Sequence, residues 1–173
     1  MTGEWEQRGG EDWVVHTRAV RATPEEVWSA LTEPARISRW AGEVRAYDDD
    51  DGCSFVDFEA ADQQPATYRV DHCEPGWSVA LTLHDPGHAT AWRLELDLLR
   101  DCETTVLKVG QSLGSLALAP CVATACEFYL DRLVSLLERR RASELDLDEY
   151  FLARADHYRL LFPVGEPAKH RVS

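Results

Sequence analysis

Two histidines in the middle of the sequence have the type and spacing to bind a metal ion. His84 and His88 flank Asp85-Pro86-Gly87, a turn sequence that would bring the two imidazoles close together. Two imidazoles and a carboxylate are ligands that Zn²⁺ accepts. A polar hairpin tip explains the same residues without a metal, and we expect no metal at this turn.

The acidic run Asp48–Asp51, followed by Gly52, has the composition of a calcium-binding loop. The EF-hand pattern requires carboxylates at positions one, three and five and a glycine at position six. A loop that starts at Asp48 puts Gly52 at position five, and the flanking residues have the pattern of strands rather than helices. We therefore predict a solvated turn here.

Other catalytic signatures are absent from the sequence. It contains no G-x-S-x-G nucleophile motif, no Walker loop and no G-x-G-x-x-G dinucleotide motif. Its five cysteines are an odd number and include no C-x-x-C pair, which favours reduced thiols over a disulfide or zinc framework. The sequence therefore predicts neither a cofactor nor a catalytic residue.

Composition narrows the class of partner. The 173 residues include 31 acidic and 18 basic side chains, which gives a formal net charge of −13. A negative surface repels phosphate groups, so we expect neither nucleic acid nor an anionic membrane surface as a partner. No apolar run approaches the ~20 residues of a membrane-spanning helix. The N-terminal segment lacks the apolar core of a signal peptide, so we expect a cytoplasmic protein.

The longest predicted helix covers residues 120–141 and would organise the fold. Pro120 suits the first turn of a helix, and the arginines at 139–141 complement the negative end of the helix dipole. Apolar residues recur every three or four positions, which is the period of one helix face. They are Val122, Ala125, Cys126, Tyr129, Leu130, Leu133, Leu136 and Leu137.

A curved sheet is expected to pack against this helix. Residues 13–21 alternate as a strand, and Thr23-Pro24-Glu25-Glu26 is a capping box that starts the first of two short helices. Further segments alternate between apolar and polar side chains and are joined by short turns, which is typical of antiparallel strands. These segments are 43–47, 53–60, 67–74, 77–83, 91–99 and 105–111. The order predicts an α+β fold in which the sheet wraps around the long helix.

The chain divides into three parts. Residues 1–11 are expected to be a disordered leader, residues 12–142 the folded domain, and residues 143–173 a C-terminal helical extension and tail. In the extension, Asp148 would cap a helix from Glu149 to about Leu161. The apolar side of that helix must dock on its own chain or on a partner chain, so a homodimer through the extension is one alternative. Deleting residues 143–173 is expected to leave the domain folded.

Three segments carry a family resemblance. They are residues 22–34 (ATPEEVWSALTEP) with the following Ile37-Ser38-Arg39-Trp40, residues 105–112 (TVLKVGQS), and the long helix. With them, residues 13 to about 141 resemble the START-like (SRPBCC) superfamily, and are most similar to homologues of the heat-shock protein 90 ATPase activator C-terminal domain. The resemblance implies a helix-grip fold with a cavity between sheet and helix. Superfamily members are lipid and small-molecule carriers, polyketide cyclases and co-chaperone modules, and they share no single set of catalytic residues.

The implied cavity would lie between one face of the helix and the inner face of the sheet. Trp40 would close its mouth, and polar groups of the wall would orient a ligand. We expect those groups to be Tyr129, His72, Tyr68 and Gln111. The full set of expected ligand-binding residues is Trp40, Phe58, Tyr68, Val70, His72, Leu94, Leu107, Val109, Gln111, Val122, Cys126, Tyr129 and Leu133. A filled core without a ligand explains the same apolar residues.

Three functions remain open at this stage. The first is binding of a small hydrophobic or amphipathic molecule, such as a lipid, in the cavity. The second is a co-chaperone-like interaction module that contacts a chaperone ATPase in a stress response. The third is a cyclase-type enzyme in which His72 or a carboxylate in the pocket acts as the base. A ligand retained in purified protein would favour the first, and stimulation of a chaperone ATPase would favour the second.

Overall fold

The computed structural model describes residues 3–59, 65–84, 92–101, 104–140 and 146–162. Within these residues, eight strands form one antiparallel sheet with the order β1-β2-β8-β7-β6-β5-β4-β3. The strands are β1 (Glu4–Arg8), β2 (Glu11–Val20), β3 (Glu43–Asp48), β4 (Ser54–Glu59), β5 (Ala66–Glu74), β6 (Ser78–Leu83), β7 (Arg93–Asp101) and β8 (Thr104–Leu113).

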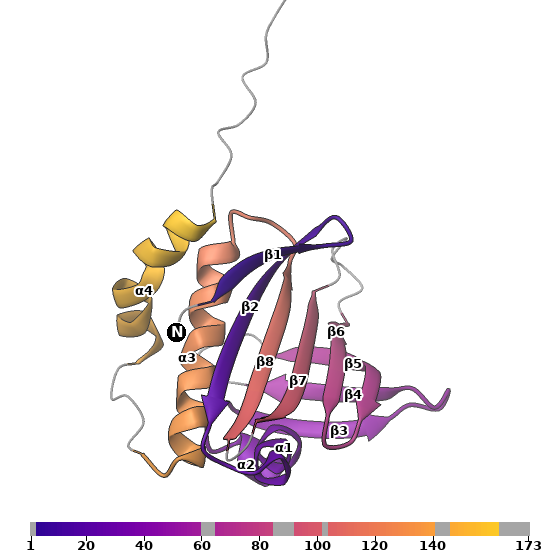
Figure 1. Ribbon diagram of the computed structural model, residues 1–173. Coiled ribbons are helices and arrows are strands. Elements are labelled where there is room, and N and C mark those ends of the chain that lie inside the picture. Colours follow the sequence, from indigo (N-terminus) through magenta and orange to yellow (C-terminus); the bar gives the residue numbers. More distant parts are fainter. Residues whose placement is uncertain (1–2, 60–64, 85–91, 102–103, 141–145, 163–173) are drawn as a thin grey trace, which may run out of the picture.

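Four helices complete this part of the chain: α1 (Pro24–Thr32), α2 (Pro34–Ile37), α3 (Ala119–Leu137) and α4 (Leu147–Leu161). Figure 1 shows the curved sheet wrapped around one side of α3, with α1 and α2 at one end and α4 running beside α3. The predicted α+β helix-grip fold is confirmed.

The capping box predicted at Thr23 is present. Thr23 Oγ1 accepts a hydrogen bond from the Glu26 backbone N–H at 3.2 Å, and Glu26 Oε2 accepts one from the Thr23 N–H at 3.0 Å. α1 buries Val27 and Ala30, and the Trp40 indole N–H donates to the Ala30 carbonyl at 3.0 Å. These contacts fix α1 and the chain after α2 at one end of the sheet.

The helix α3 is shorter than predicted and is covered on more than one side. It ends at Leu137 instead of Arg141, because Arg139 has a φ of 53°, in the left-handed region where helices end. Its buried residues include the polar Thr124, Glu127 and Ser135. These side chains would face water if α3 packed only on the sheet, but α4 packs along α3 as well.

The N-terminal segment is a strand, so the predicted disordered leader is wrong for the residues that the structure describes. β1 pairs with β2 through partners such as Trp5 and Val14. Gly9 and Gly10 join the two strands with φ values of 59° and 85°, the two positive values that a tight hairpin turn requires. The Gly9-Gly10 pair was the signal of this hairpin in the sequence.

The C-terminal extension docks on its own chain. Asp146, rather than the predicted Asp148, caps α4, and its carboxylate accepts from the Glu149 N–H at 2.8 Å. Tyr158 and Phe162 are fully buried in a core cluster with Val14 and Ala123. Of the two docking modes expected for the apolar side of this helix, the structure has the intramolecular one. That side is therefore covered by the protein's own chain.

Cys53, Cys73, Cys121 and Cys126 are free thiols, and Cys102 lies outside the described residues. Among the described residues, no helix is long and apolar enough to cross a membrane.

Candidate ligand-binding site

A cavity of about 510 Å³ lies between the inner face of the sheet and α3. Small-molecule sites commonly have volumes of roughly 300–1,000 Å³ and mostly apolar walls. Nine of the residues predicted to bind a ligand line this cavity. They are Trp40, Phe58, Tyr68, Leu94, Val109, Gln111, Val122, Cys126 and Tyr129. The alternation in the strands and the helical period of α3 had placed them on facing surfaces.

Two of the predicted residues belong to the packed core instead. Leu107 and Leu133 are fully buried and form one cluster with Val20, Val27 and Leu130. Their side chains pack in this buried cluster, so no space remains there for a ligand. The sequence pattern could not separate these positions from the cavity wall, because both are apolar and share the same faces.

A β-bulge removes His72 from the cavity. In β5 the pairing with β6 shifts between Val70 and His72, so that Val70 opposes Leu81 while His72 opposes Ala80. One extra residue reverses the alternation of side chains between the two faces of a strand. His72 is therefore exposed on the outer face, and Val70, although half-buried, does not line the cavity either. Both had been predicted as ligand-binding residues, and only an observed register could reveal the bulge.

The cavity wall also includes residues that the prediction missed. Leu147 and Phe151 come from α4, one helical turn apart, and close the side of the cavity that the sheet leaves open. The other missed residues come mainly from α1, α2 and neighbouring strands, where alternation was a usable signal. They are Leu31, Ile37, Ala41, Val44, Val56, Leu81, Trp92, Arg93, Leu96, Cys121, Ala125 and Leu130.

The wall of the cavity carries uncharged polar groups. Burial raises the pKa of Tyr68, and its hydroxyl makes no hydrogen bond to the residues that the structure describes. The Gln111 side-chain amide likewise has no hydrogen-bond partner among them. Burial raises the pKa of the Cys126 thiol to about 12, so this sulfur is a neutral thiol and not a nucleophile at neutral pH.

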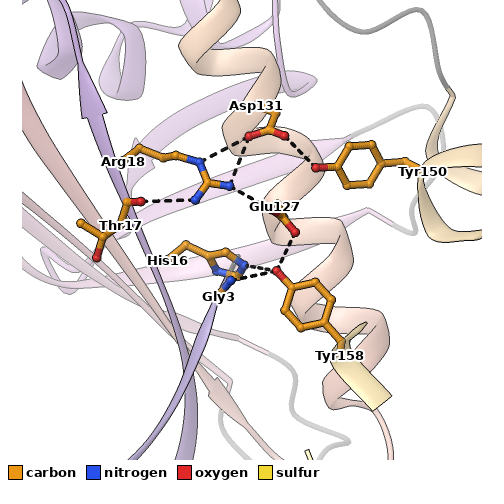
Figure 2. Close-up of polar contacts among 8 residues, drawn as sticks. All are labelled: Gly3, His16, Thr17, Arg18, Glu127, Asp131, Tyr150 and Tyr158. Carbon is orange, nitrogen blue, oxygen red and sulfur yellow. Dashed lines mark hydrogen bonds and ion pairs between the residues drawn. The ribbon is translucent and has the colours of Figure 1, made fainter. Parts of the chain in front are cut away.

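A network of buried polar side chains holds α4 against α3 and β2, and we call it the α4 clasp (Figure 2). At one end, the Tyr158 hydroxyl donates to Glu127 Oε2 at 2.7 Å and accepts from the Gly3 backbone N–H at 3.0 Å. The same oxygen lies 3.0 Å from His16 Nε2. Glu127 is only 2% exposed, and His16 and Tyr158 are fully buried.

The other end of the clasp joins Arg18 of β2 to the start of α4. Arg18 contacts Glu127 Oε1 and Asp131 Oδ1, both at 3.2 Å, and the Tyr150 hydroxyl donates to Asp131 Oδ2 at 2.7 Å. Tyr150 directly precedes Phe151, which lines the cavity. The clasp therefore fixes one wall of the cavity from the opposite side of α3. It also explains why Asp131 lies half-buried.

The clasp predicts a pH dependence of stability. Burial, and the charge of Arg18, lower the pKa of His16 from 6.5 to about 4, so the folded protein keeps the imidazole neutral. The unfolded chain binds a proton at this residue below about pH 6.5. The free energy of unfolding should therefore fall as the pH drops through this window, with a contribution from His16 of about 3 kcal/mol.

Urea unfolding of wild type and His16→Gln at about pH 7 and about pH 4.5 measures this contribution. The variant cannot titrate at position 16, so it should lose clearly less stability over the interval. Equal losses in the two proteins would show that His16 is not the responsible group.

The described residues of the two candidate metal-binding turns lie at the protein surface. His84 is exposed, while Asp85 and His88 lie outside the described residues. In the acidic turn, Asp49 Oδ1 accepts from the backbone N–H groups of Asp51 and Cys53 at 3.1 and 2.7 Å, so its carboxylate stabilises the turn. In the part of the chain that the structure describes, no group of three or more His, Cys, Asp or Glu residues is arranged to hold a metal ion.

A curved antiparallel sheet that grips a long helix over an apolar cavity defines a START-like protein of the helix-grip class. The chain belongs to the family described as Activator of Hsp90 ATPase homolog 1-like protein, whose model matches residues 21–138, or 118 of its 173 residues. The match begins just before α1 and ends just after α3. It does not include β1, β2 or α4.

Solved structures share this fold. CalU16 from Micromonospora echinospora has a TM-score of 0.72 at 20% identity, over 94% of this chain and 96% of that one. The Aha1 dimer from Colwellia psychrerythraea has a TM-score of 0.62 at 17% identity, over 73% and 96%. DynU16, from the dynemicin biosynthetic locus, has a TM-score of 0.63 at 24% identity, over 73% and 47%. No curated protein matches the sequence.

Proposed function

We propose that this protein binds a small apolar or amphipathic molecule in the cavity between the sheet and α3. The observation that carries the proposal is the combination of a cavity of about 510 Å³ with an apolar wall and two polar side chains, Tyr68 and Gln111, that lack a protein partner in the described residues. The side chains of Tyr68 and Gln111 are half-buried, and a bound molecule would supply the missing hydrogen-bond partner. The helix-grip fold of the family supports the same function.

The proposal predicts that Cys126→Trp blocks binding. Cys126 lies on the α3 wall, and an indole in its place would occupy part of the cavity. The matched control is Cys53→Trp, which makes the same change at an exposed turn. Binding is measured by titrating the neutral dye N-phenyl-1-naphthylamine and a panel of lipids, with circular dichroism to verify folding. The dye should bind to wild type and to Cys53→Trp, and at least about tenfold more weakly to Cys126→Trp, which corresponds to about 1.4 kcal/mol.

Ala125→Phe narrows the cavity from the same wall with a smaller added side chain. It replaces Cys126→Trp in the binding experiment if that variant does not fold. If wild type binds neither the dye nor any lipid, or if both wall variants bind as wild type does, the cavity is not a ligand site.

A second candidate function is interaction with a chaperone ATPase. Membership in a family described by an activator of the Hsp90 ATPase favours it. It is tested by adding the protein to the Hsp90-type chaperone of the same cell and measuring ATP hydrolysis. Stimulation that persists in Cys126→Trp would assign this activity to the surface rather than to the cavity.

The cyclase-type alternative required His72 or a carboxylate in the pocket as its catalytic base. His72 lies on the outer face of the sheet. Among the described residues that line the cavity there is neither a carboxylate nor an imidazole. We therefore propose no reaction for this site.

A further inference from the structure

The wall of the cavity offers no charged partner to a ligand. Of the described lining residues, Arg93 alone has a charged side chain, and this side chain points away to form an ion pair with Glu11 at 2.9 Å. The neighbouring Leu94 and Trp92 are apolar, and the Cys126 thiol stays neutral because it is buried. A charged group that entered this space would lose its water without gaining a counter-ion.

The wall does offer hydrogen bonds to a neutral molecule. Tyr68 comes from β5 and Gln111 from β8, which are three strands apart in the sheet. At a spacing of ~4.8 Å between neighbouring strands, their backbones are separated by about 14 Å across the sheet. The hydroxyl of Tyr68 and the amide of Gln111 can each donate and accept. They therefore suit carbonyl, hydroxyl or ester oxygens on separate parts of a ligand.

We propose that the ligand of this cavity is an uncharged molecule with oxygen-containing polar groups, such as an alcohol, ketone, ester or phenol, and that carboxylates, phosphates and protonated alkylamines are excluded. This inference rests on the proposed function. Burying an ion without a partner costs much more free energy than burying a neutral polar group that is hydrogen-bonded. The net charge of −13 adds a long-range repulsion of anions, which would include ordinary fatty acids.

The experiment compares ligands that share one chain and differ in charge. Protein saturated with N-phenyl-1-naphthylamine is titrated at neutral pH with 1-decanol, sodium decanoate and decylammonium chloride, each below its micelle concentration. We expect decanol to displace the dye, with an apparent Kd lower than those of the two ions by about tenfold or more. Cys126→Trp narrows the cavity, so any displacement of the dye that occurs equally in this variant takes place at another site.

A variant that adds a charge to the cavity wall tests whether the missing counter-ion is the reason that charged ligands bind weakly. Gln111→Lys introduces an ammonium group into the cavity wall and should tighten decanoate binding about tenfold while weakening that of decylammonium. The matched control is His72→Lys, which adds the same charge on the exposed outer face and should leave the order of the three ligands unchanged.

The outcomes separate this inference from the proposed function. If decanoate or decylammonium binds to wild type as tightly as decanol does, the cavity binds ligands but does not select neutral ones, and the inference is wrong. If the dye and all three compounds fail to bind, the proposed function is wrong and the inference fails with it. If Gln111→Lys does not fold, the comparison of the three ligands on wild type still decides.

Discussion

A protein that ends at Arg140, without α4, should lose at least about 5 kcal/mol of unfolding free energy and be largely unfolded at room temperature. Tyr150, Tyr158 and Phe162 are all buried, and full burial of one large apolar side chain contributes roughly 1.5–3 kcal/mol. Native domains have only about 5–15 kcal/mol in total. The truncation also exposes the side of α3 that carries Glu127 and removes the hydroxyl that binds it. This expectation replaces the earlier one that the domain folds without residues 143–173.

Thermal and urea unfolding, followed by circular dichroism, measure the effect. The matched control is a protein that ends at Phe162, which keeps α4 and the buried phenylalanine. We expect the control to unfold as the full chain does, and the shorter protein to show little or no cooperative transition. A cooperative transition within a few degrees of the full chain would mean that α4 contributes little to stability.

Glu127→Ala should destabilise the protein by about 3–5 kcal/mol, the range for removing one partner of a buried ion pair. The change leaves the Arg18 guanidinium, which is 10% exposed, with only the half-exposed Asp131 as its counter-ion. It also leaves the Tyr158 hydroxyl without its acceptor. Glu127→Gln keeps an acceptor for Tyr158 but removes the negative charge, so its effect should lie between those of wild type and Glu127→Ala.

Urea unfolding at neutral pH of these variants, with Glu59→Ala as a control at the exposed end of β4, tests this prediction. The double variant Arg18→Met, Glu127→Leu replaces both charges by apolar groups of similar size and should be more stable than Glu127→Ala. A loss of less than about 1 kcal/mol for Glu127→Ala would show that water or a rearranged side chain replaces the carboxylate without difficulty.

Local sequence patterns were sufficient to predict the architecture of the domain. The Thr23 capping box, the alternating segments from Val56 to Gln111 and the apolar period of α3 each describe one element and its buried face. A sheet and a helix with such faces have few ways to cover them, so the helix-grip fold follows. Most of the cavity wall follows too, because Phe58, Leu94 and Cys126 lie on the faces that the fold brings together.

The tertiary structure alone decided which of these faces enclose space and which polar residues are buried. Leu107 and Leu133 have the same pattern as their neighbours, yet they are fully buried in one core cluster. A single extra residue in β5 places His72 on the outer face of the sheet, and the periodicity of the sequence does not reveal it. Glu127 looks like a solvent-exposed residue in the sequence, because its partners Arg18 and Tyr158 are 109 and 31 residues away. Periodicity reports the faces of one element, whereas burial of a polar face depends on which distant segment packs over it.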